Sequence, residues 1–373
     1  MSFPQGFTAQ VARCGLKSNG DPELAVVRSE RPCKAAGVFT TNRVAAAPVR
    51  YCQQLLARAN DMVSAVVINS KNANAVTGPQ GDRDCARLAS LVDAGDVLTM
   101  STGVIGQPMP MGVYEKGLEN LQDADAELLA RAMMTTDTHP KVVVRELEGT
   151  RWLGVAEGAG MIHPDMATLL ALVVTDAQIP ADDLQQALVD ANQVSFQCIT
   201  VDGDTSTNDT LLVLANGCSG NAPAGWRTTL REVVVELAQM VAFDGEGARH
   251  RVTLHVSGTA SDAEARLVGR VVLTSPLVKT AIAGKDANWG RILAAAGRSG
   301  VTFEPAEAAL WWNQLQLLEA GAPTNPGSAA EARAVEGNEV ELRLVLGQGL
   351  GRATLWSCDL THEYVSINGD YRT

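Results

Sequence analysis

Several short motifs in this 373-residue chain contain residue types that could do chemistry. The small-residue loop at 101–106 (STGVIG) could present backbone N–H groups, and residues 135–138 (TTDT) offer hydroxyls just before a strand-like run. At 158–170 (GAGMIHPDMATLL), glycines and a proline precede Thr168, where a strongly apolar run begins. Glycine allows the backbone to adopt a strained turn at such a point. These residues predict a candidate acyl-transfer site.

Three other motifs are weaker. The GQGLG at 347–351 is followed by strand-like sequence, so a turn between strands explains it better than a dinucleotide site. The AGKDANWG at 283–290 lacks the upstream glycine of a phosphate-binding loop. Asp202 and Asp204 follow a strand-like run, as a phosphatase aspartate pair would, but a polar turn accounts for them equally well.

Strand-like and helix-like stretches alternate around these motifs. Apolar and β-branched runs predict buried strands, and apolar residues at helical spacing predict helices. The predicted strands are residues 63–69, a hairpin formed by 141–147 and 151–156, a central strand at 168–175, and three strands within 339–368. The predicted helices are residues 181–194 and a long helix over 230–241. The fold is therefore mixed α and β, and a loop at 322–330 could separate the last segment from the main body.

Composition limits the class of protein. The length suggests two or three domains, and the net charge of −12 makes nucleic acid a poor partner. The longest apolar run, 166–174, has about half the length of a membrane-spanning helix, and the N-terminus lacks the pattern of a secretory signal, so we expect a cytoplasmic protein without membrane contact. Seven cysteines with no C-x-x-C pair, and five histidines without zinc spacing, predict idle thiols and no metal.

Nine segments, in order, resemble the ornithine acetyltransferase family, the glutamate N-acetyltransferases of arginine biosynthesis. The resemblance extends over essentially the whole chain. The segments are VFTTNRVAAAPV (38–49), VVINSKNANAVTG (66–78), STGVIGQPMPM (101–111), MMTTDTHPK (133–141), GAGMIHPDMATLLALVVTDA (158–177), TVDGDTSTNDT (200–210), FDGEGA (243–248), SPLVKTAIAGKDANWGR (275–291) and CDLTHEYVSINGDYRT (358–373).

The resemblance implies a precursor that cuts itself between Ala167 and Thr168. The products would be an α chain, residues 1–167, and a β chain, residues 168–373, whose last part forms a smaller domain. The new α-amine of Thr168, with an ordinary pKa of about 7.7–8, could act as general base for its own hydroxyl. The implied fold is a mixed α/β sandwich of two central sheet layers flanked by helices, with a smaller C-terminal α/β portion. The two chains are expected to stay associated and to assemble further, as a heterotetramer.

The reaction implied by the resemblance is ping-pong acetyl transfer from N2-acetylornithine to glutamate through an acetyl ester of Thr168, with acetyl-CoA as a further donor left open. Thr102 and Gly103 would stabilise the oxyanion. The substrate contacts implied by the family are Thr135, position 157 (here Glu157), Thr168, Glu246, Asn368 and Thr373. Glu246 is expected to pair with the δ-ammonium of ornithine. No organic cofactor or metal is implied.

Two positions depart from the family pattern. Glu157 replaces a lysine that contacts substrate, and Lys71 stands where glycine is expected. A buried carboxylate at 157 would repel a substrate carboxylate, so we hypothesise that Lys71 supplies the displaced positive charge. The alternatives are a different acyl donor, a self-processing amidohydrolase of related fold, and a non-catalytic relative.

Overall fold

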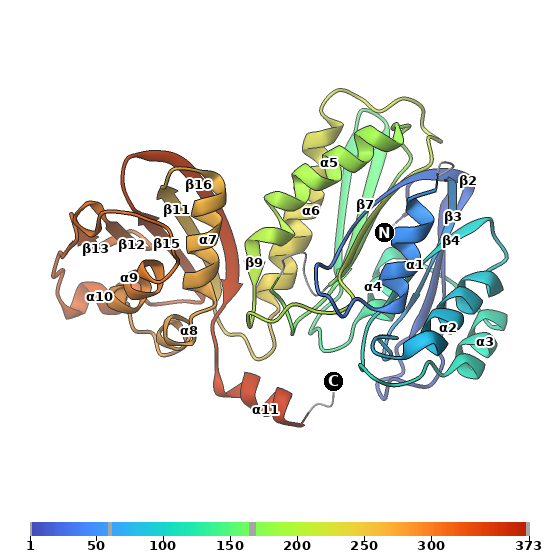
Figure 1. Ribbon diagram of the computed structural model, residues 1–373, viewed down its shortest axis with the longest axis horizontal. Helices are drawn as coiled ribbons and strands as arrows, with labels where there is room; N and C mark the ends of the chain where they lie inside the picture. The colour runs from blue at the N-terminus through green and yellow to red at the C-terminus, as the bar shows by residue number, and fades with distance from the viewer. Residues whose placement is uncertain (1, 59–61, 164–168, 371–373) are drawn as a thin grey trace. The chain divides into compact units, whose positions relative to one another are not determined.

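The structure is a computed structural model that describes residues 2–58, 62–163 and 169–370. It divides into two compact units. Of the described residues, the first comprises those up to 197 and 204–241, and the second comprises 198–203 and 242–370. Each unit contains one mixed sheet with helices packed on it (Figure 1), so the expected mixed α/β class is confirmed, with one of the two sheets in each unit.

The first unit holds a nine-stranded sheet and six helices among its described residues. Its elements are β1 (Phe7–Ala12), β2 (Leu24–Phe39), α1 (Ala47–Leu56), β3 (Met62–Asn69), α2 (Gly78–Leu91), β4 (Asp96–Ser101), α3 (Met111–Glu119), β5 (Gln122–Ala124), α4 (Ala126–Met133), β6 (Lys141–Leu147), β7 (Thr150–Glu157), β8 (Leu170–Thr175), α5 (Ala181–Gln193), β10 (Thr210–Ala215) and α6 (Trp226–Phe243), whose last two residues fall in the second unit.

The strand order of this sheet is β4-β3-β2-β10-β8-β7-β6, with β1 and β5 branching from β2. The two central strands, β8 and β10, pair in parallel, and every residue of both is buried. Their uninterrupted apolar runs follow from that position, because a strand covered on both faces has no polar side. The predicted strand at 63–69, the hairpin and the apolar strand ending at 175 are confirmed as β3, β6–β7 and β8. Residue 168 itself lies outside the described residues.

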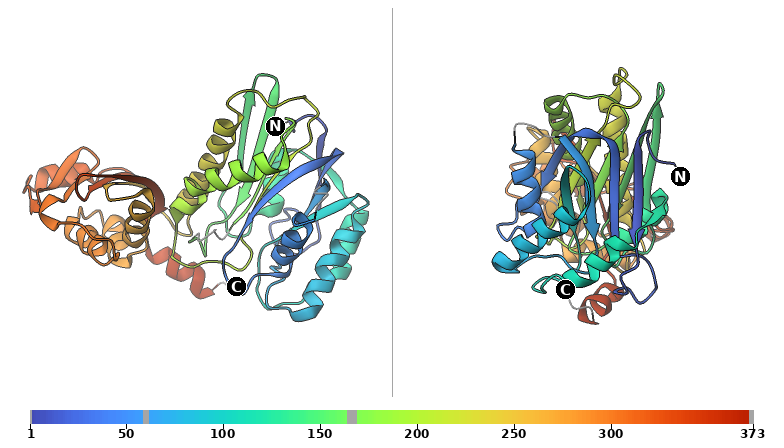
Figure 2. Two further views of the ribbon diagram at one scale, coloured as in Figure 1. Left: turned by 45° about the horizontal axis from the view of Figure 1, so that its top comes forward. Right: turned by 90° about the vertical axis from the view of Figure 1, so that its right-hand side faces the viewer.

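Helices cover both faces of this sheet. Along β7, Leu153 and Val155 join a core that includes residues of α4, whereas a side chain at Gly154 would collide with Val233 and Leu237 of α6. Alternate residues of a strand point to opposite faces, so α4 and α6 lie on opposite sides. Helices α5 and α6 run side by side on one side of the sheet (Figures 1 and 2). Both correspond to the predicted helices at 181–194 and 230–241.

The second unit holds a seven-stranded sheet in the order β14-β13-β12-β15-β11-β16-β9. Its elements are β9 (Ile199–Thr200), β11 (Arg251–Gly258), α7 (Asp262–Leu273), α8 (Pro276–Ala283), α9 (Trp289–Gly297), β12 (Ala309–Trp312), β13 (Leu315–Glu319), β14 (Ala322–Pro323), α10 (Ser328–Ala334), β15 (Glu339–Val345), β16 (Gly349–Cys358) and α11 (His362–Asp370). Two expectations are wrong here. The third strand within 339–368 is the helix α11, and the loop at 322–330 divides nothing, since it lies inside this unit.

Candidate active site at the ends of strands β4, β7 and β8

The predicted site residues fall into three groups. Ala167, Thr168 and Thr373 lie outside the described residues. Thr102, Gly103, Thr135 and Glu157 belong to the first unit, and Glu246 and Asn368 to the second. Within the first unit, the structure brings its four predicted residues to the end of the sheet where β8 begins. The contacts below establish that arrangement.

The turn after β4 is built for close approach. Gly103 has a φ of +127°, and a Cβ there would lie 2.3 Å from the backbone carbon of Lys71, so no other residue fits without a shift. The amide of Thr102 donates to the Asn69 carbonyl at 3.0 Å, whereas the amide of Gly103 makes no hydrogen bond within the described residues. The donors that this turn can offer to an oxyanion are therefore the Gly103 amide and the Thr102 hydroxyl.

Glu157, the last residue of β7, connects these segments. Its carboxylate accepts a hydrogen bond from the Leu170 amide at 3.2 Å and another from the Thr135 hydroxyl at 3.4 Å. The Thr102 side chain also hydrogen-bonds to it. Leu170 is the first residue of β8, two positions after the proposed nucleophile. Glu157 therefore links the oxyanion turn, the TTDT segment and the beginning of the central strand.

A buried ion pair fixes the TTDT segment. Lys141 Nζ lies 2.6 Å from Asp137 Oδ1, and both side chains are fully buried. Asp137 also accepts from the Gly158 amide at 2.7 Å and from the Thr135 amide at 3.0 Å. Neither Asp137, within TTDT, nor Lys141, at the start of a predicted strand, was predicted to have a functional role. The available signal was an acidic residue and a lysine four positions apart beside a hydroxyl-rich turn.

The two carboxyls near this end of β7 differ in charge. Burial, and then the negative charge of Asp137, raises the pKa of Glu157 to about 8. Burial alone would also raise the pKa of Asp137, but the Lys141 ammonium and the hydrogen bonds to Asp137 hold it below its usual value. At pH 7 Asp137 is thus ionised and Glu157 mostly protonated. The repulsion expected between Glu157 and a substrate carboxylate is correspondingly weaker than a full negative charge would give.

Lys71 lies in the same region. It lines a cavity of about 160 Å³ together with Thr135, Asp137, Met134 and the loop at 17–21. Its backbone has a φ of +75°, a conformation that favours glycine. Lys17, which lines the same cavity, donates to three carbonyls (those of Pro22, Arg131 and Ala132), and burial lowers its pKa to about 8. Lys71 and Thr135 thus line the same cavity, and this supports the hypothesis that Lys71 contributes to the substrate site.

In the second unit, the predicted residues Glu246 and Asn368 contact each other. Asn368 Nδ2 donates to Glu246 Oε2 at 2.6 Å, from the last turns of α11 to the loop after α6. Glu246 is only 7% exposed, so it is not the surface carboxylate that a loop after a long helix would suggest. The Thr361 hydroxyl donates to the Gly247 carbonyl and fixes the start of α11 against the same loop.

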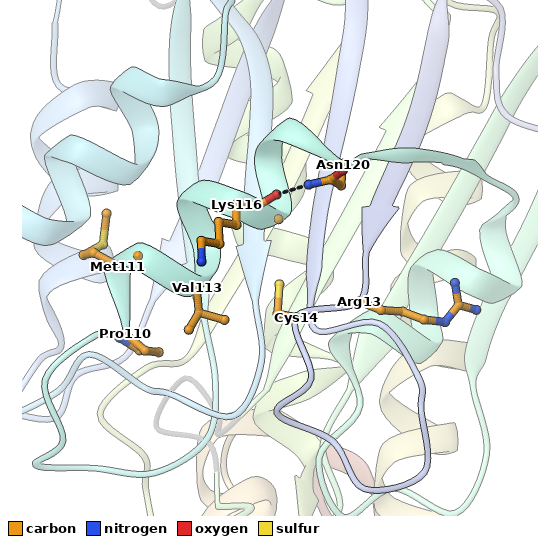
Figure 3. A pocket seen from close by; sticks show the side chains of 9 residues that line it. Arg13, Cys14, Pro110, Met111, Val113, Lys116 and Asn120 are labelled. Atoms are coloured by element: carbon orange, nitrogen blue, oxygen red, sulfur yellow. Dashed lines mark hydrogen bonds between the residues drawn. The ribbon is translucent and has the colours of Figure 1, made fainter.

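A larger and more open cavity, of about 640 Å³, lies between the segment after β1 and helix α3 (Figure 3). It contains none of the predicted site residues. The residues that line it include Arg13, Cys14 and Lys116. The backbone carbonyl of Lys116 accepts a hydrogen bond from the side-chain amide of Asn120. Burial raises the pKa of Cys14 to about 11, so this thiol is not a ready nucleophile.

Among residues 2–58, 62–163 and 169–370, no group of three or more His, Cys, Asp and Glu side chains could hold a metal ion. No helix in the same ranges has the length and apolarity needed to cross a membrane.

Comparison with known proteins gives consistent matches. The model of the ArgJ family matches residues 8–373. The "Arginine biosynthesis bifunctional protein ArgJ" of Symbiobacterium thermophilum is 45% identical over 402 residues, which cover 100% of this chain and 98% of that protein. The protein of the same name from Chlorobaculum tepidum is 42% identical, and the match covers 100% of this chain and 96% of that protein. A crystal structure of the Bacillus halodurans argJ protein is 38% identical with a TM-score of 0.51, and covers 52% of this chain and 96% of the crystallised chain.

Proposed function

The chain belongs to the ArgJ family of bifunctional arginine-biosynthesis enzymes, and from that premise we propose that it transfers an acetyl group from N2-acetylornithine to glutamate after cutting itself between Ala167 and Thr168. The observation that carries the proposal is the convergence of Thr102, Thr135 and the Leu170 amide on Glu157, next to the start of β8. Glu157 thereby connects the turn proposed to bind the oxyanion, the TTDT segment and the segment that follows the proposed nucleophile.

Self-cleavage begins with attack of the Thr168 hydroxyl on the Ala167 carbonyl carbon. The peptide C–N bond breaks as an ester forms, and the former amide nitrogen becomes the α-amine of Thr168. Water then hydrolyses the ester to give a carboxylate at residue 167 and a free threonine hydroxyl.

Acetyl transfer follows the same chemistry twice. The α-amine takes the proton of the Thr168 hydroxyl, which attacks the acetyl carbonyl of acetylornithine; ornithine leaves with a proton. The amine of glutamate then attacks the acetyl-threonine ester and releases N-acetylglutamate and the free hydroxyl. The oxyanion formed in each half-reaction is assigned to the Gly103 amide and the Thr102 hydroxyl. Such donors contribute because they are already oriented before charge develops.

The proposed substrate contacts are Thr135, Glu157, Thr168, Glu246, Asn368 and Thr373. Glu246 is assigned to the δ-ammonium of ornithine, since it is an almost buried carboxylate with one side-chain donor. The two chains are proposed to remain associated, because strands β8 and β10 of the β chain pair with β7 and β2 of the α chain.

The test begins with the intact mass of the denatured protein beside that of a Thr168→Ala variant. The proposal requires masses for residues 1–167 and 168–373 in the wild type and one full-length mass in the variant. Acetylornithine is then supplied with and without glutamate. Release of acetate without glutamate would instead indicate the amidohydrolase alternative, and a wild-type chain that is neither cut nor active would refute the enzyme proposal.

A second candidate within the same chemistry is a transferase that uses a different acyl donor. Glu157 favours it, because the family lysine is replaced by a buried and mostly protonated carboxyl. Competition between acetylornithine, acetyl-CoA and other N-acyl amino acids, measured as kcat/KM with glutamate as acceptor, distinguishes the two.

A further inference from the structure

Asp209, the residue just before β10, is a buried carboxyl that lacks a well-formed hydrogen bond within the described residues. Its side chain is 1% exposed, neither Oδ atom has a described donor at hydrogen-bonding distance and angle, and the Leu169 amide and the Thr40 side chain act on it only weakly. A buried carboxyl in this state is unfavourable, because it has lost water and gained little in exchange. The functional steps described above do not use this residue. Its position therefore favours a further partner, beyond those that the described residues supply.

The strand register places Asp209 at the start of β8. Thr210 lies opposite Leu170, and its amide donates to the Leu169 carbonyl at 3.0 Å. On the other side of β8, Glu157 lies opposite the same Leu170. Paired strands are about 4.8 Å apart, so Asp209 and Glu157 stand on either side of the first residues of β8. The Asp209 backbone is held in place, since its carbonyl accepts from the Thr40 amide at 3.0 Å.

The surroundings of Asp209 are short of positive charge. Burial raises its pKa well above the usual value; the Leu169 amide and the Thr40 side chain lower it, and the negative charge of Glu157 raises it. Two cations act on Glu157: Lys141, whose ammonium is already bound to Asp137, and Lys17, whose ammonium already donates to three backbone carbonyls. A positive group placed between the two carboxyls would therefore stabilise both.

We propose that Asp209 is the charge partner of a primary ammonium group at the start of β8, with Glu157 as the second carboxyl. The inference rests on the proposed function, which provides two such groups. One is the α-ammonium created by the cut, which is covalently attached one residue before Leu169. The other is the α-ammonium of the acceptor glutamate, whose nitrogen must reach the acetyl-threonine ester.

Asp209 acts in this proposal through the amine and not on the acetyl group, so it is a positioning residue. When ionised it stabilises the ammonium form and sets the pH at which the amine becomes free to accept a proton. If the ammonium is the α-ammonium of Thr168, Asp209 sets the pH at which kcat falls on the acidic side of its pH profile. If it belongs to glutamate, Asp209 governs the KM for glutamate. These two readouts separate the sources, and a purely structural role would change neither.

The experiment compares wild type with Asp209→Asn, and with Asp176→Asn as the matched control. Asp176 is equally buried at the other end of β8, where it accepts the amides of Gln5 and Arg151. For each protein we would measure the extent of cleavage by intact mass, the pH profile of kcat, and the KM for glutamate. The control is expected to keep the wild-type profile and KM.

Two results support the proposal. A shift of the acidic limb to lower pH by about one unit or more in Asp209→Asn, at unchanged KM, assigns the chain's own ammonium. A rise of the glutamate KM by about tenfold or more, at an unchanged profile, assigns the acceptor. If the wild type is cut and active and Asp209→Asn matches it in both readouts, the inference is wrong. A wild type that is uncut or inactive would overturn the proposed function and this inference with it.

A measurement on the wild type covers the case in which Asp209→Asn does not fold. The pH dependence with which an amine-reactive reagent labels the N-terminus of the β chain, followed by mass, gives the pKa of that amine. Pairing with a carboxylate predicts a value above the ordinary 7.7–8.0 of an α-amine. The KM for glutamate is measured beside that for its α-hydroxy analogue as a competing ligand. An ordinary amine pKa together with equal binding of the two ligands would contradict both sources.

Discussion

Replacing Lys141 with methionine would leave Asp137 as a buried charge without its cation. Removing one partner of a buried ion pair costs about 3–5 kcal/mol. Both side chains here are fully buried at an Nζ–Oδ1 distance of 2.6 Å, but Asp137 would keep its two amide donors, Gly158 and Thr135. We therefore expect the lower end of that range, about 3 kcal/mol of unfolding free energy at pH 7.

The loss should depend on pH with a definite sign. In the wild type the pKa of Asp137 is lowered, so its contribution to stability is present at neutral pH and disappears as pH falls through the usual aspartate range. In Lys141→Met the unpaired carboxyl is buried with a raised pKa, and protonation relieves its cost as pH falls. The difference in stability between the two proteins is thus largest near pH 7 and shrinks toward pH 4.

Urea unfolding of both proteins in the uncut Thr168→Ala background, followed by tryptophan fluorescence, measures this difference on a single chain. Lys116→Met, which removes an exposed lysine, is the control and should change the unfolding free energy by less than about 0.5 kcal/mol. The double variant Asp137→Asn/Lys141→Met should be less destabilised than Lys141→Met alone. A loss below about 1 kcal/mol, or one that is the same at pH 7 and pH 4, would refute the reasoning.

Three further outcomes are expected. Thr102→Val and Gly103→Ala should each reduce kcat about 10²–10³-fold, with Thr102→Ser close to wild type; a loss confined to KM would contradict the oxyanion assignment. Activity and stability should fall as pH rises through about 8, where Glu157 ionises beside Asp137, and Glu157→Gln should remove that limb; an unchanged basic limb in the variant would show that another group titrates. Lys71→Gly should raise the KM for acetylornithine, measured by initial rates, by about tenfold, and an unchanged KM would exclude a substrate role for this lysine.

The parts of the fold with a strong local pattern could be predicted from the sequence. The runs that became β3, β7 and β8 are apolar and almost continuously buried, and α6 has buried apolar residues at helical spacing. Helix α11 lies where a strand was expected, and its residues Tyr364, Val365 and Ile367 are of types that favour strands. It is a helix in which Tyr364 and Asn368 reach the Asp202 and Glu246 carboxylates, and such contacts are not visible in a linear pattern.

The boundary between the compact units could not be predicted for a similar reason. Residues 198–203 leave the first unit for six positions because Ile199 pairs with Trp356, more than 150 positions away. The candidate site shows the same limit. Glu157 was selected from the family resemblance, but its partners Thr135 and Leu170, and the buried Asp137–Lys141 pair, follow from strand register and burial. Asp209 carries no sequence signal beyond its place in TVDGDTSTNDT.

The strand order β2-β10-β8-β7 has a consequence for how the protein can be refolded. Strands β8 and β10 follow the proposed cut and are inserted between two strands that precede it, so the sheet must form before the chain is divided. An uncut chain would regain this order by a unimolecular reaction. Once divided, the same sheet could be regained only by association of two fragments, at a rate that depends on their concentration. After self-cleavage, refolding would therefore become slower as the protein is diluted. The lifetime of the cleaved enzyme would then depend on a low rate of unfolding.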